Sequence, residues 1–335
     1  MPQFGAGKPS PGAFFDTDFR TIDSLLALAL LHGAQSKGDC RVAIVTMSRP
    51  NLQVAGFADA VERFYRGPAG NFAQLPPIGM ITAGDAGETS PAFTMPFEKK
   101  KADGTPAYRN DVRSVIETGD PNTLLRNYLE AQYDQNSFVV LAGPATNLTA
   151  ALDFPRLKDL FAVKTKYLVV SANESRMTAD LSAARRLFAE WPVPIFVAGQ
   201  EIGAALPFPG ASIDKEFAAA VPDNPVADAY RAYQPMPYDA ASCDMAAALY
   251  AARPQEKYFQ ISAPGVITIG ANGGLSFTPS AKGTHQQLAL DPTQKEKLLQ
   301  AYVDLASAKP VPPRRFRPAA VEDPAKPVAP VVKQQ

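Results

Sequence analysis

The chain has 335 residues, of which 46% are hydrophobic and 20% charged, a composition typical of a globular protein. Lys plus Arg and Asp plus Glu each number 33, so no net charge draws the chain to nucleic acid or to an anionic membrane. The two cysteines, Cys40 and Cys243, exclude a disulfide framework and a four-thiolate zinc site. We therefore expect a small-molecule partner, with no nucleic acid and no membrane involved.

The two ends of the chain indicate its compartment and its organisation. The first eleven residues lack the basic start and apolar stretch of a signal peptide, which predicts a cytoplasmic protein, or an exported one whose leader was removed. The last 26 residues are rich in proline and cannot bury a core, which predicts a disordered or extended tail. The expected organisation is a flexible start at residues 1–11, one domain at 12–309 and the tail at 310–335.

Along the body of the chain, short apolar runs alternate with longer segments of helical periodicity. The runs are β-branched or aromatic and predict strands at residues 13–17, 42–47, 78–82, 138–141, 167–171 and 195–197. Helices are predicted at residues 22–31, 55–65, 123–132, 181–190, 240–251 and 293–308. This alternation predicts an α/β fold with an open, mostly parallel, Rossmann-like sheet and helices on both faces. Residues 258–261 and 266–269, followed by a Gly-rich turn at 272–274, predict a small antiparallel hairpin near the C-terminus.

Three carboxylates follow the first predicted strand. Asp16 and Asp18 lie at its end, and Asp23 lies at the start of the next helix. Bringing them together costs repulsion unless a cation or several donors compensate, and such oxygen ligands suit Ca²⁺ or Mg²⁺. A structural explanation is equally good, because strand ends, Asx turns and first helical turns all favour aspartate.

Two later segments place polar residues in comparable positions. Residues 143–147 (Gly-Pro-Ala-Thr-Asn) follow a strand and begin a helix, and Asp244, directly after Cys243, opens an Ala-rich helix. Each alone is explained by a turn, a helix cap or an acid at a helix start. In open parallel sheets, ligands bind beyond the carboxyl ends of the strands, so the three segments together indicate a site.

Taken together, these segments resemble the motifs of the inosine/uridine-preferring nucleoside hydrolase family. The family's Asp-x-Asp-Pro-Gly-x-Asp-Asp-Ala motif corresponds to residues 16–24, its Gly-Pro-Leu-Thr-Asn motif to 143–147, and its His-Asp-Pro-x-Ala motif to 243–247. Order and spacing agree across residues 13–276. The resemblance implies a divergent member with the nucleoside hydrolase fold. It also implies hydrolysis of the N-glycosidic bond of a ribonucleoside or related ribosyl compound, a role in purine or pyrimidine salvage, and a homodimer or homotetramer.

Carried over position by position, the resemblance implies a Ca²⁺ site and a catalytic base. The metal ligands would be Asp18, Asp23, the backbone carbonyl of Thr146 and Asp244, with Asp16 supporting them from behind. Asp18 would take a proton from the metal-bound water that attacks the anomeric carbon. Substrate contacts would come from Asn51, Asn173, Glu174 and Arg176.

Several positions depart from the family pattern. Ile22 replaces an acid that binds ribose hydroxyls, and Phe19 with Arg20 replaces Pro-Gly in the first turn. Cys243 stands where a histidine protonates the leaving base, so it either donates that proton or is a small buried hydrophobe. Arg20 and Arg176 either bind a phosphate or carboxylate of the substrate or pair with a nearby carboxylate. The alternative function is therefore an altered protein that acts on another, for example anionic, glycoside or only binds ligand.

Overall fold

The computed structural model describes residues 8–66, 75 and 77–310, and all structural statements concern these residues. Residues 1–7 of the predicted flexible start at 1–11 lie outside them, and so do residues 311–335 of the predicted tail at 310–335. Residues 8–11 are tied to the body of the domain, because Asn136 donates to the Pro9 carbonyl (3.0 Å) and Ser10 donates to the Gly38 carbonyl (2.8 Å).

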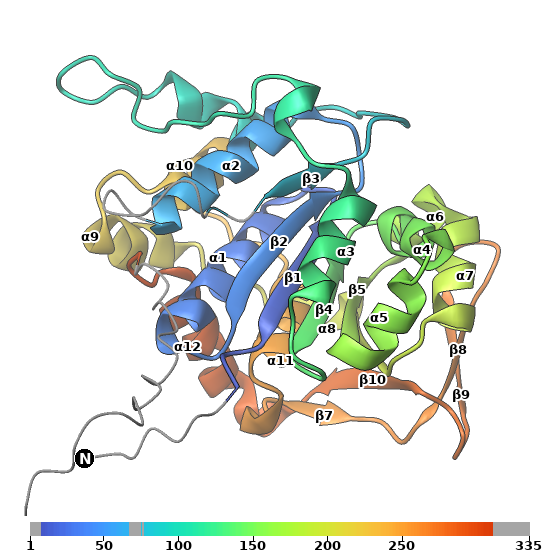
Figure 1. Ribbon diagram of the computed structural model, residues 1–335. Helices are drawn as coiled ribbons and strands as arrows, with labels where there is room; N and C mark the ends of the chain where they lie inside the picture. The colour runs from blue at the N-terminus through green and yellow to red at the C-terminus, as the bar shows by residue number, and fades with distance from the viewer. Residues whose placement is uncertain (1–7, 67–74, 76, 311–335) are drawn as a thin grey trace, which may run out of the picture.

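One mixed sheet organises the fold, with strand order β3-β2-β1-β4-β5-β6-β10-β8-β9 and with β7 paired to β10 (Figure 1). The strands are β1 Gly12–Thr17, β2 Arg41–Met47, β3 Ile78–Met80, β4 Ser137–Ala142, β5 Thr165–Ala172, β6 Ile195–Gly199, β7 Phe259–Ile261, β8 Gly265–Ile269, β9 Leu275–Pro279 and β10 His285–Leu290. The pairs from β3 across to β10 are parallel, whereas β10 pairs antiparallel with β7 and β8, as does β8 with β9.

Helices cover both faces of the sheet and create two hydrophobic cores. The helices are α1 Ile22–Lys37, α2 Leu52–Arg66, α3 Pro121–Glu130, α4 Thr146–Asp153, α5 Leu157–Lys164, α6 Glu174–Ala179, α7 Leu181–Glu190, α8 Gln200–Ala205, α9 Ala218–Ala220, α10 Pro225–Tyr233, α11 Cys243–Ala252 and α12 Lys295–Ala306. Side chains alternate along a strand, so Phe15 of β1 packs in the core with α1, α11 and α12, and Phe14 packs in the core with α3, α5 and α7. In Figure 1 the latter helices lie in front of the strands.

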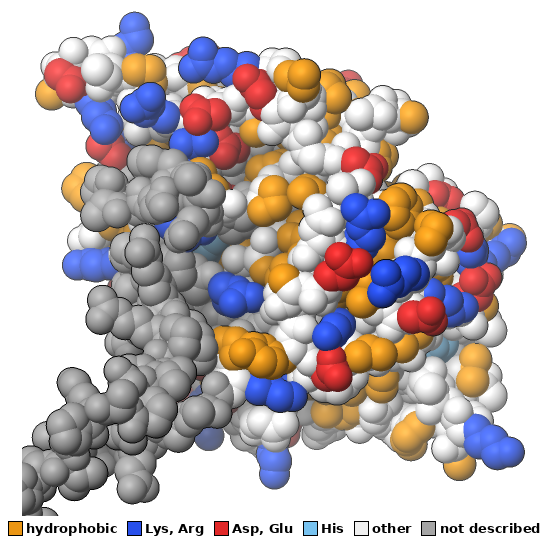
Figure 2. Space-filling view, viewed as in Figure 1, with side chains coloured by type: hydrophobic (Ala, Val, Ile, Leu, Met, Phe, Trp, Pro, Cys, Tyr) orange, Lys and Arg blue, Asp and Glu red, His pale blue; other side chains and the backbone are white. Residues whose placement is uncertain are grey.

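The surface of this front face carries charges of both signs. Figure 2 shows blue and red side chains next to one another over the green helices of Figure 1. Two of the ion pairs there join Arg186 to Asp153 (2.5 Å) and Lys164 to Asp134 (2.7 Å). Among the described residues, no helix is both long and apolar enough to cross a membrane.

The predicted fold class is confirmed, and the six predicted parallel strands each coincide with one of β1 to β6. The predicted hairpin is also confirmed, since β8 and β9 pair around the turn at 272–274. No range was predicted for β9, the second strand of the hairpin, and β10 was not predicted at all. β10 lies between β6 and β8 and connects the hairpin to the main sheet, so the hairpin extends the sheet instead of standing apart from it.

Candidate active site

A pocket of about 760 Å³ lies beyond the carboxyl ends of β1, β5 and β6. Its walls come from the turn after β1 (Asp18 to Asp23), the start of α6 after β5 (Asn173 to Arg176), Gln200 after β6, and the segment from Tyr233 to Cys243. Segments far apart in the chain meet here because parallel strands end at one edge of the sheet. This is where open α/β sheets bind ligands, and the volume suits a small molecule.

Asp18 lies in the turn that follows β1. Phe19 adopts a left-handed conformation (φ 44°) and is buried, so the chain turns sharply where the family pattern has Pro-Gly. The Asp18 carboxylate accepts a hydrogen bond from the Arg20 backbone N–H (3.2 Å) and forms an ion pair with the Arg20 guanidinium (3.4 Å). Burial raises the pKa of Asp18, while the Arg176 charge opposes that rise. Asp18 is therefore a buried carboxylate that lines the pocket.

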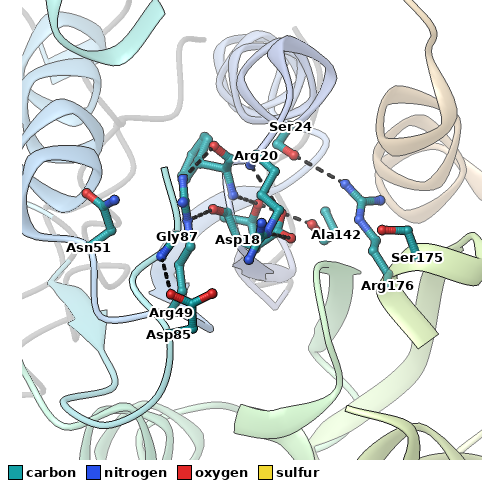
Figure 3. A network of polar contacts seen from close by, with 12 residues as sticks. Asp18, Arg20, Ser24, Arg49, Asn51, Asp85, Gly87, Ala142, Ser175 and Arg176 are labelled. Carbon is teal, nitrogen blue, oxygen red and sulfur yellow. Dashed lines mark hydrogen bonds and ion pairs between the residues drawn. The ribbon is translucent and has the colours of Figure 1, made fainter. Parts of the chain in front are cut away.

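Arg49, which follows β2, fixes this turn from behind and was not singled out from the sequence. Its guanidinium donates to the backbone carbonyls of Asp18 (2.6 Å) and Phe19 (3.2 Å), and to those of Ala86 and Glu88 (both 2.9 Å), as Figure 3 shows in part. The turn and the loop around residue 87 are thereby tied together. A sequence signal for this role is weak, since any arginine after a strand can be solvated.

Asp23, at the start of α1, connects this helix to the start of α11, where the predicted metal ligand Asp244 lies. Its two carboxylate oxygens accept hydrogen bonds from the backbone N–H groups of Asp244 (2.7 Å) and Met245 (3.1 Å), at the start of α11. Burial, followed by the nearby Asp244 charge, raises the pKa of Asp23 well above its usual range. Asp23 therefore serves α11 as a helix-start acceptor supplied by α1.

Asp244 is completely buried and is surrounded by donors. Arg176 forms a bidentate ion pair with it, in which Nη1 donates to Oδ1 and Nη2 donates to Oδ2 (2.7 Å for the second bond). Ser171 donates to Oδ1 (2.5 Å) and Ser24 donates to Oδ2 (2.6 Å). Figure 3 shows Arg176 extending from α6 toward Ser24 on α1. Although burial lowers the pKa of Arg176, the charge and hydrogen bonds of Asp244 raise it overall, with Asp18 and Asp23 contributing.

Asp16, the next-to-last residue of β1, is also fully buried. Its Oδ2 accepts hydrogen bonds from Thr46 and from the Asn147 side chain (2.7 Å). Within the described part of the chain, no group donates to its Oδ1. Burial raises the pKa of Asp16 to about 7. Asn147, not its neighbour Thr146, is thus the residue through which the second sequence motif reaches the first.

The three aspartates among the four predicted Ca²⁺ ligands lie near one another, but the four ligands do not form a metal site. The Thr146 carbonyl accepts a hydrogen bond from the Thr149 hydroxyl (3.2 Å), and Thr146 lines a separate cavity of about 470 Å³. The Asp23 carboxylate accepts hydrogen bonds from two backbone N–H groups of α11, and the Asp244 carboxylate is paired with Arg176. In residues 8–66, 75 and 77–310, no three His, Cys, Asp or Glu side chains form a group that could hold a metal ion. The arrangement therefore does not fit the calcium that the resemblance implies.

The predicted substrate residues are divided between the pocket and its surroundings. Asn173 and Glu174 line the pocket; Asn173 caps α6 by accepting from the Arg176 backbone N–H (2.9 Å), and Glu174 is exposed. Asn51 lies outside it, on the other side of Asp18 from Arg176 in Figure 3. The Asn51 amide donates to Thr89 (2.8 Å), while its oxygen accepts from the Val54 backbone N–H (3.1 Å).

Cys243, the predicted proton donor, lines the pocket but is only 7% exposed. Burial, together with the charges of Asp244 and Asp23, raises the pKa of its thiol to about 12. The thiol also donates to the Ala198 carbonyl (3.4 Å). Such a group keeps its proton near neutral pH, which makes it a weak acid for catalysis.

Two tyrosines that were not predicted complete the pocket. Tyr233, the last residue of α10, and Tyr238, in the segment that connects α10 to α11, both line it. Tyr238 stacks on Tyr230 with ring centroids 4.4 Å apart. Because the connecting segment is irregular and contains Pro235 and Pro237, no periodic pattern marks Tyr238 in the sequence.

Comparisons with known proteins bear on the fold. No family model and no curated protein matches the sequence. Solved structures do match: an inosine-guanosine nucleoside hydrolase has a TM-score of 0.65 at 17% identity, covering 88% of this chain and 98% of its own. A plant nucleoside hydrolase has a TM-score of 0.63 at 17% identity, covering 90% of this chain and 100% of its own. The type III effector protein XopQ, solved with adenosine diphosphate ribose, has a TM-score of 0.59 at 13% identity, covering 92% of this chain and 94% of its own. The chain has the nucleoside hydrolase fold, which confirms the predicted resemblance at that level.

Proposed function

We propose that this chain hydrolyses the N-glycosidic bond of a ribosyl compound in the pocket beyond β1, β5 and β6. The observation that carries the proposal is the position of Asp18, a buried carboxylate that lines a pocket of about 760 Å³. The fold gives further support, since it is shared with nucleoside hydrolases over 88% of this chain.

Asp18 is the candidate general base. A carboxylate whose pKa is raised toward neutrality accepts a proton more readily than a solvated one, and burial raises the pKa of Asp18. In the proposed step, the water oxygen forms a bond to the anomeric carbon while Asp18 takes a proton from the water. The C–N bond breaks, and its electron pair goes to the nitrogen of the leaving group. The Arg20 backbone N–H and guanidinium orient the carboxylate.

Other residues of the pocket suit the charge that develops on the sugar. Positive charge builds up on the ribosyl ring as the bond breaks, and nearby carboxylates stabilise it electrostatically. Asp23 lines the same pocket as Asp18 and supplies a second carboxylate. Tyr233 and Tyr238 offer aromatic surface on which a flat leaving base could stack.

The leaving group receives little acid assistance from the predicted donor. The Cys243 thiol, with a pKa raised to about 12, is a poor proton source, and no histidine is among the pocket's lining residues. We therefore expect faster turnover of substrates whose leaving group departs as a stable anion or as a neutral base. The nitrophenolate of p-nitrophenyl riboside is one such group.

The proposed reaction uses no calcium ion, although the family resemblance implies one. A metal at Asp244 would have to displace the Arg176 guanidinium and both serine hydroxyls. The proposed hydrolysis therefore rests on Asp18, Asp23 and the pocket alone.

A second candidate is an anionic ribosyl compound, and Arg20 favours it. The Arg20 side chain is 49% exposed and lines both the pocket and an adjacent cavity formed by residues 85–91. A half-exposed guanidinium at a pocket mouth can bind a phosphate group. XopQ, which shares the fold, was solved with adenosine diphosphate ribose.

The test compares wild type with Asp18→Asn on p-nitrophenyl riboside, a panel of nucleosides and ADP-ribose. We expect Asp18→Asn to lower kcat/KM by about 10²–10⁴-fold, the usual contribution of a general base. Asp153→Asn is the matched control, because it removes an exposed carboxylate that is paired with Arg186 away from the pocket, and it should retain wild-type activity. If wild type binds a panel member and cleaves none, the chain is a binding protein and the hydrolase proposal is wrong.

A further inference from the structure

We infer that Arg176 supplies the cation of this site in place of a metal ion, and that the chain neither binds nor needs calcium there. The inference concerns ligands and charge only, so it does not depend on which reaction the pocket performs. It follows from three features: the donors around Asp244, the use of Asp23, and the charge balance of the cluster.

The first feature is that Asp244 has no acceptor capacity left. A carboxylate offers about two lone-pair positions on each oxygen. Oδ1 accepts from Ser171 and from Arg176 Nη1, and Oδ2 accepts from Ser24 and from Arg176 Nη2. The serine hydroxyls in turn accept from Arg176, at 2.9 Å for Ser171 and 3.4 Å for Ser24. The network is closed, and a metal could enter only by breaking it.

The second feature is the orientation of Asp23. Both of its oxygens accept backbone N–H groups at the start of α11, so they contribute to holding α1 against that helix. These N–H groups are among those that a helix start leaves without intrahelical partners. Turning Asp23 toward a metal would leave two buried N–H groups without acceptors, which is unfavourable.

The third feature is the charge of the cluster. Arg176 is paired with Asp244 and also lies near Asp18 and Asp23, and Arg20 is paired with Asp18. Two permanent cations therefore already lie among the three carboxylates that a metal ion would need. A calcium ion added beside buried Arg176 would be repelled by it.

The arginine is also positioned by the fold. Asn173 caps α6 through the Arg176 backbone N–H, which places residue 176 in the first turn of that helix beside the pocket. An arginine side chain cannot be deprotonated in a protein, so this cation is present at every pH of interest and independent of ion supply. Unlike a metal, it cannot coordinate the attacking water, which leaves proton removal to Asp18.

The experiment measures calcium binding by the full chain after treatment with a chelator, using calorimetry and thermal unfolding. Wild type should show no saturable site and no change of Tm when millimolar calcium is added. Arg176→Asn removes the cation that is paired with Asp244 and lies near Asp18 and Asp23. We expect this variant to gain a calcium site and a Tm that rises with calcium, since a ligand that binds only the folded state stabilises it. Arg186→Asn, which removes an exposed arginine paired with Asp153 and Glu190, should behave as wild type does.

One calcium ion bound per wild-type chain, with a matching rise in Tm, would overturn the inference. If Arg176→Asn does not fold, Arg176→Lys keeps a positive charge at the site and should remain insensitive to calcium. If Arg176→Lys binds calcium with the affinity expected for Arg176→Asn, that result also contradicts the role inferred for the positive charge at residue 176.

Discussion

Two buried aspartates at the same end of the sheet, Asp16 and Asp244, are held in opposite ways. Both are fully buried. Asp16 has only the neutral donors Thr46 and Asn147, both on one oxygen, whereas Asp244 has a guanidinium and two hydroxyls shared over both oxygens. The difference shows that burial alone does not decide how a carboxylate is stabilised. The charge of its donors does, and only Asp244 is matched by a cation.

The largest expected effect comes from breaking the Arg176–Asp244 pair. Arg176→Met leaves a buried carboxylate without its cation, and we expect the free energy of unfolding to fall by about 3–5 kcal/mol. Urea denaturation of Arg176→Met, Asp244→Asn and the double variant measures the coupling. Contacting residues in one network couple by about 0.5–3 kcal/mol, so the double variant should lose less than the two single losses combined. Strict additivity would show that the two residues do not interact.

The next largest effect is a change of the free energy of unfolding with pH, caused by the titration of Asp16. Folding raises the pKa of Asp16 from 3.8 to about 7, so the folded chain binds this proton more tightly than the unfolded chain does. The resulting stabilisation is fully present below about pH 4 and is lost as the pH rises through 7, at about 1.4 kcal/mol for each pKa unit of the shift.

Asp16→Asn removes this titration but keeps a similar shape. The free energy of unfolding, measured in urea between pH 4 and pH 8, should fall with pH more steeply for wild type than for the variant. Equal slopes would mean that Asp16 does not gain its proton on folding. Asp39→Asn, at a partly exposed carboxylate paired with Arg253, controls for the loss of a negative charge elsewhere.

The smallest effect is expected at Asn51, whose neutral hydrogen bonds lie outside the pocket. Asn51→Ala removes the acceptor for the Val54 N–H at the start of α2, which costs about 0.5–2 kcal/mol. Because Asn51 does not line the pocket, KM for the ribosyl substrate should not change. A variant of normal stability with a raised KM would instead support the original prediction that Asn51 binds substrate.

The sequence predicted the parallel part of the fold well because strands covered on both faces are continuous apolar runs. β1 and β4 are buried along their whole length, and each contains an unbroken apolar run, at residues 13–15 and 138–142. β10 was missed because it is only partly buried and carries His285, Gln286 and Gln287 in its first half. No apolar run or clear alternation identifies such a strand from local sequence.

The candidate site was predicted in part, for a different physical reason. The ends of parallel strands meet at one edge, so the convergence of Asp18, Asp23 and Asp244 could be expected from strand order. The partner of Arg176 could not be predicted, because an arginine side chain is long and flexible. The sequence allowed Arg176 either to contact a ligand or to pair with a carboxylate. The structure pairs it with Asp244, which lies far along the chain.

The most direct test of this account is a crystal structure of the wild-type chain grown with calcium in the solution. We expect Arg176 to remain paired through both guanidinium nitrogens with Asp244, and no ion to lie among Asp18, Asp23 and Asp244. A calcium ion there, with 6–8 oxygen ligands at about 2.3–2.6 Å and the Arg176 side chain displaced from Asp244, would contradict it.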